Sequence, residues 1–555
     1  MNKKDEERNG LLNSDMTRRE ALQWGLKAGA GLASLSIPSF SSAAQAAPSE
    51  PKYGGTLRIQ GQDPLGWDPH KTFSYRTHNA LNFVYGRALE FPAGPEHDPT
   101  DYTPIPGLVE SWEQPNKTTY IFHVRKGVTF HNKPPVNGRE LIAADIKYTI
   151  ERMWEKKFTY RDLFALVSRI ETPDKHTLKV TLKEPYAPFL ASMANHYVSI
   201  LAKEVEGKYG DFVKSETAIG TGPFILESYQ PNVKSVFRRN PDYYRKGMPY
   251  VDTIEWIVMP DPSARLSALR SGNLDIELAM AAPLIETVKR TNPELTFYDF
   301  VGVGGTVLYF NVNRKPFNDI RVRRAMALAF DRKAWLGAFF LGKGAIDNGP
   351  PVLAALKEWK LPTNQLGPGA RYFEYNLDEA KKLMKEAGYP NGFKSKLDGT
   401  GGYGPAIVDQ MELIKDMMSK IGIEITLNLK DYADWAATGH AGIYEEMAYG
   451  PMTPYIEVDE WTYEMLHTGA SANKCHCADP QLDELLKQQR RTFDKAERKK
   501  VLEQVQKHVA DQVYYIYPPI GFTYAAWHPW VKNYRPHSGY LSGEVYRGVW
   551  LDKKA

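Results

Sequence analysis

Strand-like and helix-like segments alternate along this chain, and this alternation restricts the folds that it can adopt. Alternating apolar and polar residues predict strands, for example over 120–124 and 176–182. Apolar residues at helical spacing predict helices over 143–153, 377–387 and 405–420. Because no short period relates these segments, they predict α/β lobes rather than a solenoid or an all-β barrel.

Length and charge narrow the possible functions. The chain has 555 residues, more than one hydrophobic core usually holds, so we expect two or three lobes. It carries 70 basic and 66 acidic residues, for a formal charge of +4. This small imbalance argues against nucleic-acid binding. The 12 Trp, 32 Tyr and 23 Phe residues suit either ligand pockets or large cores.

The N-terminus has the pattern of an export signal. Arg18 and Arg19 precede a modest apolar stretch from Trp24 to Ile37, and Ala44-Gln45-Ala46 follows as a small-residue cleavage site. The apolar stretch is too short and too rich in Gly, Ala and Ser to span a bilayer stably. We therefore predict that residues 1–46 are a twin-arginine signal peptide and that the mature protein is periplasmic. The alternative is an amphipathic helix that docks on the body.

The cysteines do not indicate a disulfide-built fold. Only Cys475 and Cys477 occur, separated by His476. A disulfide between residues i and i+2 is strained, and a Cys-His-Cys metal site would need a further ligand from elsewhere. We interpret the pair as adventitious and expect neither a metal nor a cofactor.

Many dispersed segments, in one order along the mature chain, resemble the family 5 extracellular solute-binding proteins, the dipeptide- and oligopeptide-binding receptors of ABC importers. The matching segments are Gly54–Leu57, Leu65–Pro69, Pro106–Trp112, Phe122–His131, Ala144–Ile146, Gly220–Phe224, Arg239–Tyr244, Leu269–Asp275, Asn311–Pro316, Asp319–Ala325, Asp331-Arg332 and Ala380–Phe393.

The resemblance implies a bilobed α/β periplasmic-binding-protein fold of the class II type, with an extra domain inserted in the first lobe. Two crossovers would join the lobes, which would close on a solute by a hinge motion. The expected boundaries are 50–86, 217–303 and 515–555 for lobe I, 87–216 for the inserted domain II, and 304–514 for lobe II.

A glycine-rich segment, Gly399-Thr400-Gly401-Gly402-Tyr403-Gly404, precedes the helix expected from Pro405. It fits the G-x-G-x-x-G pattern of dinucleotide sites, and Glu424 follows at about the spacing of a ribose-binding acid. Nucleotide cofactors are scarce outside the cytoplasm, however. We prefer a loop whose backbone N–H groups face the cleft and hold a solute carboxylate. A plain interlobe loop is the other interpretation.

A second segment, Tyr449 to Trp461, corresponds to the place where peptide-binding relatives carry an Asp-Pro turn whose acid pairs with the α-amino group of the ligand. No Asp-Pro occurs here, and an acidic cluster of Glu457, Asp459 and Glu460 takes its place. Because a buried carboxylate needs a cationic partner, we expect Asp459, and next Glu457, to meet an amine or guanidinium of the solute. The alternative is a solvated acidic loop. The aromatic residues expected around the cleft are Trp67, Tyr403, Trp435, Tyr449 and Trp461.

The resulting hypothesis is a monomeric periplasmic receptor. It would capture a short peptide or another polar, amine-bearing solute and deliver it to an ABC permease and ATPase complex at the inner membrane. One alternative is an exported hydrolase acting on peptides or glycans, which the lack of G-x-S-x-G and H-E-x-x-H motifs disfavours. Another is a chaperone-like or sensory protein that uses the same fold without transport.

Export should depend on the arginine pair. Changing both Arg18 and Arg19 to Lys should leave uncleaved precursor in the cytoplasm, because recognition of this signal requires guanidinium groups that lysine does not supply. Fractionation followed by immunoblotting of precursor and mature forms measures this. Normal processing of the double variant would contradict the assigned route.

Overall fold

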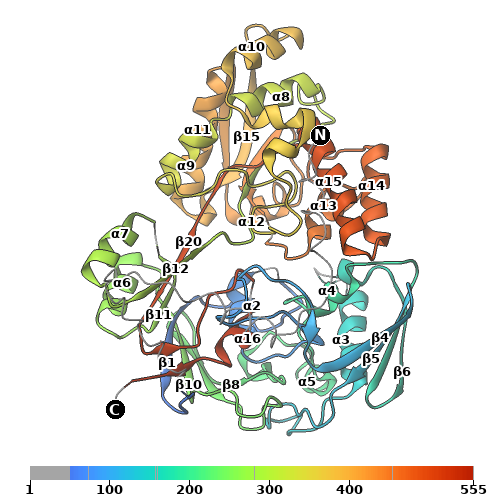
Figure 1. Ribbon diagram of the computed structural model, residues 1–555, viewed down its shortest axis with the longest axis vertical. Coiled ribbons are helices and arrows are strands. Elements are labelled where there is room, and N and C mark those ends of the chain that lie inside the picture. The colour runs from blue at the N-terminus through green and yellow to red at the C-terminus, as the bar shows by residue number, and fades with distance from the viewer. Residues whose placement is uncertain are drawn as a thin grey trace, which may run out of the picture. The chain divides into compact units, whose positions relative to one another are not determined.

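Three β-sheets of four or more strands organise the part of the chain that the structure describes (Figure 1). The computed structural model describes residues 50–553, apart from 73, 157, 159, 160, 281, 453 and 540. The predicted signal peptide, residues 1–46, lies outside the described residues. No helix within the described range is long and apolar enough to cross a bilayer.

The first sheet has seven strands in the order β12-β20-β11-β1-β10-β9-β8 and forms the centre of lobe I. Strand β1 runs parallel to β10 and places the fully buried Leu57 opposite Ile254. The strands are β1 (Thr56–Gly61), β8 (Phe224–Gln230), β9 (Lys234–Arg239), β10 (Thr253–Val258), β11 (Ile276–Met280), β12 (Thr296–Phe300) and β20 (Thr523–Trp527). The helices of this lobe are α2 (Tyr75–Leu81), α6 (Pro262–Arg270), α7 (Ala282–Thr291) and α16 (Ser542–Tyr546).

The inserted domain contains an antiparallel sheet in the order β4-β5-β7-β6. Alternate residues of β5 and β7 are buried, which confirms the two strands expected there, and α3 covers this sheet by packing on β6 and β7. The strands are β4 (Val109–Asn116), β5 (Thr119–Val124), β6 (Val167–Asp174) and β7 (Thr177–Leu182). The helices are α3 (Ala143–Glu155), α4 (Phe189–Ala194) and α5 (Lys203–Tyr209).

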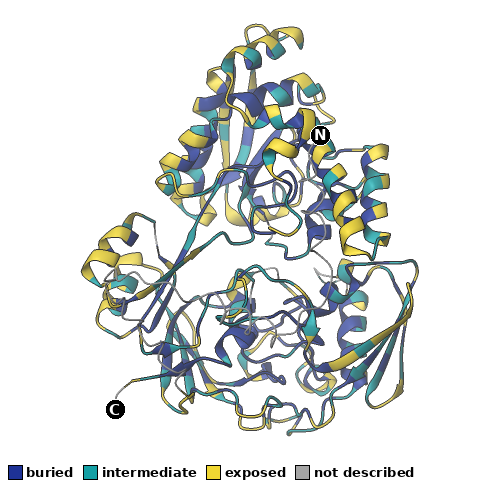
Figure 2. Cartoon of the chain, in the orientation of Figure 1, coloured by how far each residue is buried: buried dark blue, intermediate teal, exposed yellow. Residues whose placement is uncertain are grey.

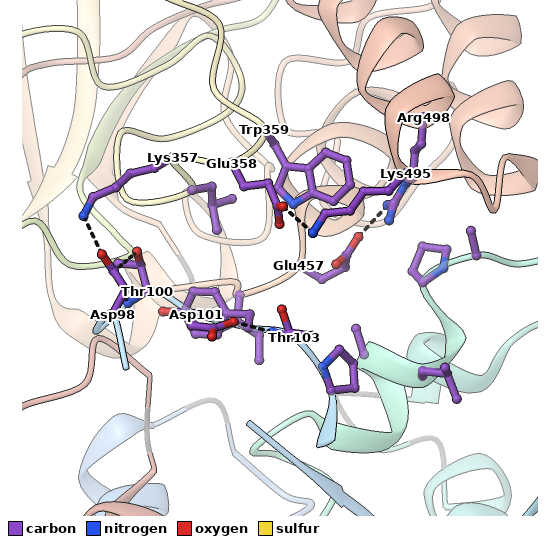
Figure 3. A pocket seen from close by; sticks show the side chains of 18 of the residues that line it. Asp98, Thr100, Asp101, Thr103, Lys357, Glu358, Trp359, Glu457, Lys495 and Arg498 are labelled. Atoms are coloured by element: carbon purple, nitrogen blue, oxygen red, sulfur yellow. Dashed lines mark hydrogen bonds and ion pairs between the residues drawn. The ribbon is translucent and has the colours of Figure 1, made fainter. Parts of the chain in front are cut away.

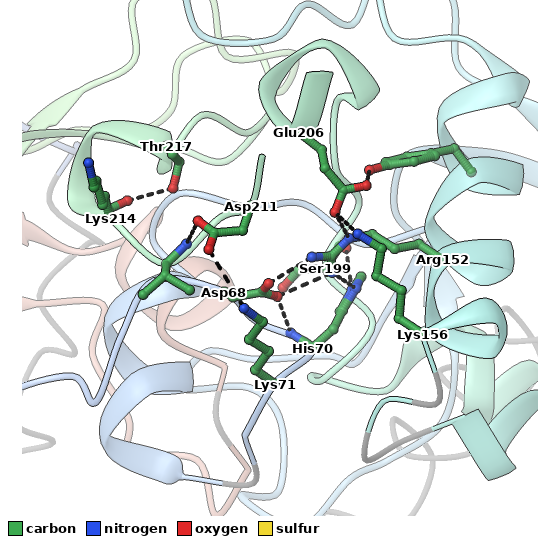
Figure 4. A network of polar contacts seen from close by, with 12 residues as sticks. Asp68, His70, Lys71, Arg152, Lys156, Ser199, Glu206, Asp211, Lys214 and Thr217 are labelled. Atoms are coloured by element: carbon green, nitrogen blue, oxygen red, sulfur yellow. Dashed lines mark hydrogen bonds and ion pairs between the residues drawn. The ribbon is translucent and has the colours of Figure 1, made fainter. Parts of the chain in front are cut away.

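A buried polar network joins the inserted domain to lobe I (Figure 4). Arg152 of α3 donates to both carboxylate oxygens of Asp68, at 3.2 and 2.7 Å, and to Glu206 of α5 at 3.0 Å. Burial, and next the charge of Arg152, lowers the pKa of His70 to about 3. His70 is therefore neutral, so that its Nδ1 accepts from Arg152 while Nε2–H donates to the Ser199 carbonyl. The inserted domain is thus attached to lobe I by charge-assisted bonds that water does not reach.

Lobe II contains the third large sheet, in the order β16-β15-β17-β13-β18, with helices packed around it. Residues 320–340 form two helices rather than one, because Asp331 caps a new helix after the extended Phe330. The strands are β13 (Thr306–Phe310), β15 (Phe393–Thr400), β16 (Ile423–Lys430), β17 (Met447–Pro451) and β18 (Tyr515–Ile516). The helices are α8 (Ile320–Ala329), α9 (Arg332–Phe340), α10 (Leu377–Glu386), α11 (Pro405–Ser419), α12 (Tyr432–Ala437), α13 (Val458–Leu466), α14 (Pro480–Arg491) and α15 (Lys495–Gln512).

The chain passes between the two lobes twice. It leaves lobe I after β12 and enters lobe II at β13, through residues 301–305, and it returns after β18 to reach β20. The boundary that we expected at 515 therefore precedes a strand that still pairs with β13. Three short strand pairs complete the structure: β2 (Leu89–Glu90) with β3 (Ile105–Pro106), β14 (Gly344–Ala345) with β19 (Ile520–Gly521), and β21 (Val531–Lys532) with β22 (Trp550–Leu551).

The buried apolar residues form separate clusters in the two lobes (Figure 2). One large cluster runs continuously through lobe I and the inserted domain and also includes Ile456 of lobe II. The sheet of lobe II packs its two faces against two further clusters. Apart from Ile456, the cores of the two lobes are therefore distinct, as bodies that move relative to each other require.

Candidate ligand-binding cleft

The glycine-rich segment forms the link between β15 and α11 and presents Tyr403 to solvent. Thr400 ends β15, and its hydroxyl accepts a hydrogen bond from Gly402 N at 3.0 Å. A Cβ atom on Gly402 would lie 2.8 Å from Cβ of Tyr432, so glycine is needed for the two segments to approach. Gly404 has φ +103° at the N-cap of α11, a conformation that side-chain-bearing residues rarely adopt. Packing and turn geometry therefore explain this glycine pattern without a dinucleotide.

Two exposed tyrosines lie together at the start of α11 and of α12. The rings of Tyr403 and Tyr432 meet edge to face, with centroids 5.3 Å apart, and their exposed fractions are 40% and 51%. Trp435, one turn along α12, is fully buried, and Gly439 and Gly450 leave the space for its ring. The buried Trp435 thus packs beneath α12, while the Tyr403–Tyr432 pair stays exposed to solvent.

Lobe I contributes a third exposed aromatic residue to this region. Tyr75, the first residue of α2, is 44% exposed. Burial is the largest cause that raises the pKa of Tyr403, and the charges of Tyr432 and of Tyr75 also raise it. Each lobe therefore presents at least one exposed aromatic side chain that a ligand held between lobes could contact.

A hollow of about 230 Å³ in lobe I adjoins the same helix. Asn79 of α2 lies on its wall, four residues after Tyr75 and so on the same helix face. The aromatic rings of Trp256, Phe300 and Tyr546 line it further. Aliphatic residues and polar ones, Thr523 and Ser538 among them, also line it, so the hollow offers both apolar and polar contacts.

Of the five aromatic residues predicted to line the cleft, Tyr403 is exposed and the other four are buried. Tyr449 lies within β17, and its hydroxyl donates to Gln410 at 2.6 Å. Trp461 donates from Nε1 to the Tyr455 carbonyl at 2.8 Å. Trp67 packs edge to face on Tyr229, and Trp435 fills the space under α12. These four side chains stabilise the lobes, and the exposed pair Tyr403–Tyr432 was only half predicted.

The acidic cluster forms the N-terminus of a helix, and its charges have partners within the protein. Glu457 is the N-cap of α13, and Glu460 accepts from Glu457 N at 3.1 Å, which completes a capping box. Arg498 donates to Glu457 at 2.5 Å. Burial raises the pKa of Glu460 to about 8, so that this acid is largely protonated at neutral pH. The segment is therefore neither a solvated loop nor a set of free carboxylates.

Asp459, the residue that we first expected to bind the solute amine, forms a buried ion pair. Arg490 Nε lies 2.9 Å from both carboxylate oxygens, and Nη2 lies 2.7 Å from Oδ2. Gln489 and Tyr186 donate to the same carboxylate, and its side chain is 1% exposed. A solute amine would have to displace an arginine that already satisfies this charge, so this geometry does not support the amine-binding role.

The sequence is similar to known binding proteins over most of its length. The family model of bacterial extracellular solute-binding proteins, family 5 Middle, matches residues 103–473. The chain belongs to this family. A di/tripeptide-binding protein 1 of Pseudomonas aeruginosa is 27% identical over 520 residues, which cover 88% of this chain and 93% of that protein. Heme-binding protein A of Haemophilus influenzae is 27% identical over 519 residues, with 88% and 91% covered.

Solved structures agree with the bilobed fold of this family 5 protein. A binding protein from A. tumefaciens R10 in complex with agropinic acid has a TM-score of 0.76 and 25% identity, covering 90% of this chain and 99% of that one. A periplasmic binding protein of Helicobacter pylori in complex with the peptide STSA has a TM-score of 0.75 and 24% identity, with the same coverage. The family is one of binding proteins that act in transport.

Removing the charge of Asp459 should destabilise the protein. Asp459→Asn leaves Arg490 buried with only Glu464 as a nearby acid, and breaking one side of a buried ion pair costs about 3–5 kcal/mol. Thermal unfolding of the solute-free protein should show a melting temperature lowered by several degrees.

The matched control is Asp434→Asn, which removes an exposed acid on α12 and should leave the melting temperature unchanged. Equal melting temperatures for Asp459→Asn and the wild type would show that the pair contributes nothing, and would return Asp459 to the list of candidate solute ligands.

Proposed function

We propose that this family 5 protein captures a short peptide or peptide-like solute between Tyr75 of lobe I and the Tyr403–Tyr432 pair of lobe II. The observation that supports this proposal is the exposed ring pair of Tyr403 and Tyr432 in lobe II, together with the exposed Tyr75 of lobe I, whose charge acts on Tyr403. Aromatic faces bind peptide planes, apolar side chains and cations with little loss of side-chain entropy. A solute so held would be in contact with both lobes at once.

The start of α11 supports a role for a solute carboxylate. This helix has 15 residues, and no side chain caps its N-terminus, where Gly404 occupies the N-cap. Pro405 has no N–H and Ile407 N donates to the Gly404 carbonyl at 3.3 Å, so Ala406 N–H and the positive end of the helix dipole are the groups suited to an anion. Tyr403 lies two residues before the helix, so a carboxylate there would place the rest of the solute beside the aromatic pair.

Relatives support a small organic solute but differ in its identity. The names of similar proteins specify di- and tripeptides, heme and agropinic acid. The lack of a free acid at residues 457–460 separates this chain from receptors that pair an aspartate with the ligand's amino group. We therefore propose recognition through aromatic contacts and carboxylate binding, with any solute cation held by a ring face rather than by Asp459.

Closing on the solute would create the form that an ABC permease and its ATPase recognise, and we propose that the receptor works as a monomer. We further propose delivery to the periplasm by the twin-arginine route, which the arginine pair near the N-terminus supports. The competing function, an exported hydrolase, is tested by incubating the protein with a peptide mixture and looking for new cleavage products by mass spectrometry. Turnover would contradict the receptor proposal.

Loss of the aromatic pair should weaken solute binding without unfolding the protein. Native mass spectrometry with a mixture of di- and tripeptides identifies a bound peptide, and calorimetry then measures its affinity. Tyr403→Ala and Tyr432→Ala should each weaken binding about threefold to tenfold, because each removes a ring contact worth about 0.5–1.5 kcal/mol.

The control for this comparison is Tyr375→Ala. Tyr375 is 43% exposed and comes two residues before α10, the helix drawn at the end of lobe II that points away from lobe I (Figure 1). Its loss should leave the affinity unchanged. Equal affinities for all three variants and the wild type would remove the aromatic pair from the site.

Solute should compact the protein. A ligand that contacts both lobes binds the closed form better and shifts the population toward it by its differential affinity. Small-angle scattering should therefore give a smaller radius of gyration with the peptide identified above than without it. An unchanged radius at saturating peptide would contradict closure of the lobes on this solute.

A further inference from the structure

The inserted domain contacts lobe II directly, and three of these contacts come from one short segment before α4, in addition to those of Asp98 with Lys357 and of Asp162 with Ser471. Glu184 pairs with Arg491 at 2.5 Å, Tyr186 donates from its hydroxyl to Asp459 at 3.3 Å, and Ala187 N donates to the Arg490 carbonyl at 2.7 Å. All three contacts reach α13 or the last turn of α14. The Arg152 network fixes the inserted domain to lobe I. These three contacts therefore link that domain, and with it lobe I, to lobe II.

The middle of this contact is shielded from water. Tyr186 is 6% exposed, and the Arg490 guanidinium lies between two tyrosine rings, 3.2 Å from the centroid of Tyr463 and 5.2 Å from that of Tyr186. The same guanidinium carries the bidentate bond to Asp459 and a bond of 2.6 Å to Glu464. Separating the domains would therefore expose a buried phenol and one side of a satisfied ion pair.

The contact is narrow, because cavities lie on both sides of it. One, of about 570 Å³, lies between residues 98–104 and 187–191 on one wall and residues 356–359 and 493–498 on the other (Figure 3). Lys357 crosses its rim to Asp98 at 3.1 Å. The other, of about 480 Å³, has Arg161 and Tyr186 on one wall and His467 on the other. Separation of this interface would withdraw Ile456 of lobe II from the apolar cluster of lobe I and the inserted domain, and would leave the two clusters on the sheet of lobe II in place.

We propose that residues 184–187 are a latch, which holds the inserted domain against lobe II and stabilises the closed form before any solute contributes. Glu184, Tyr186 and Arg491 are then positioning residues: they set the affinity for solute through the open–closed equilibrium and do not contact the solute. The two crossovers permit the motion, and the Arg152 network makes the inserted domain move with lobe I. The latch also gives Asp459 of the acidic segment a role, because its carboxylate accepts the hydrogen bond from the Tyr186 hydroxyl.

The test uses the full mature protein, with no solute bound by native mass spectrometry. Spin labels are attached to Lys117→Cys in the inserted domain and Lys499→Cys in lobe II, both exposed positions. The parent protein, whose Cys475 and Cys477 are buried, controls for background labelling. Electron double resonance then gives the distribution of distances between the labels, and hence the fractions of open and closed molecules.

Reversing either charge of the exposed pair should open the latch. Glu184→Lys and Arg491→Glu should each raise the ratio of long to short distances about threefold or more, because like charges then face each other. The combined variant, Glu184→Arg with Arg491→Glu, restores an opposite pair and should return the wild-type distribution. Glu216→Lys, a reversal at an exposed acid of the inserted domain, is the control and should change nothing.

Tyr186→Phe tests the buried contact independently of the surface pair Glu184–Arg491. It keeps the ring next to Arg490 and removes the hydroxyl that donates to Asp459. It should lengthen the distances at an unchanged melting temperature. Identical distributions in the wild type, Glu184→Lys and Arg491→Glu, each with a wild-type melting temperature, would overturn the latch. A combined variant no more closed than the single variants would overturn it as well, because pairing would not be the cause. Neither result would bear on which solute is bound.

Discussion

The ion pair between Asp459 and Arg490 organises the part of lobe II that faces the inserted domain. Asp459 lies in the first turn of α13 and Arg490 in the last turn of α14, so the pair fixes the two helices to each other. The free-energy cost of burying this ion pair is offset by its bidentate geometry and by additional hydrogen-bond donors to the Asp459 carboxylate. Because the guanidinium also stacks on Tyr463 and Tyr186, this single pair connects the internal order of lobe II to its contact with the other lobe.

Because these charged side chains pair within the protein, few of them are left to bind a solute. The acids near residue 459 have arginine partners or are protonated, so they attract a soluble cation weakly. In the proposed site, recognition then depends on the exposed rings of Tyr75, Tyr403 and Tyr432 and on the uncapped start of α11. Such surfaces select by shape and by the position of a negative group, which tolerates variation in the rest of the solute.

The fold was predictable from the sequence wherever periodicity was strong. The strands at 120–124 and 176–182 and the helices at 143–153, 377–387 and 405–420 are present within a few residues. Periodicity is uninformative after α2, which ends at Leu81: Phe83, Val84 and Tyr85 are apolar because the core surrounds them. A run buried on every side carries no helical period, so periodicity could not identify it.

The site was less predictable, because exposure depends on tertiary packing. Tyr403 ends the short turn before α11 and Trp435 lies within α12, and nothing local in the sequence shows that one is 40% exposed and the other fully buried. The acidic cluster offered a signal that we interpreted as a binding motif: Glu457 and Glu460, three residues apart before an apolar helix, are a capping box. The partner of Asp459 is 31 residues away in sequence, and no local pattern could have indicated it.

The latch and the solute both act on the equilibrium between the open and closed forms. Their free-energy contributions add, so their effects on the equilibrium constant multiply. A population that moves from 1:99 to 99:1 needs about 5.5 kcal/mol of differential binding if the solute alone closes the lobes. Each contact that forms in the closed state without solute, such as Tyr186 with Asp459, lowers that requirement. A latch that is too strong would close the empty receptor and exclude the solute. A few polar contacts flanked by cavities, rather than a broad apolar interface, keep both states within reach.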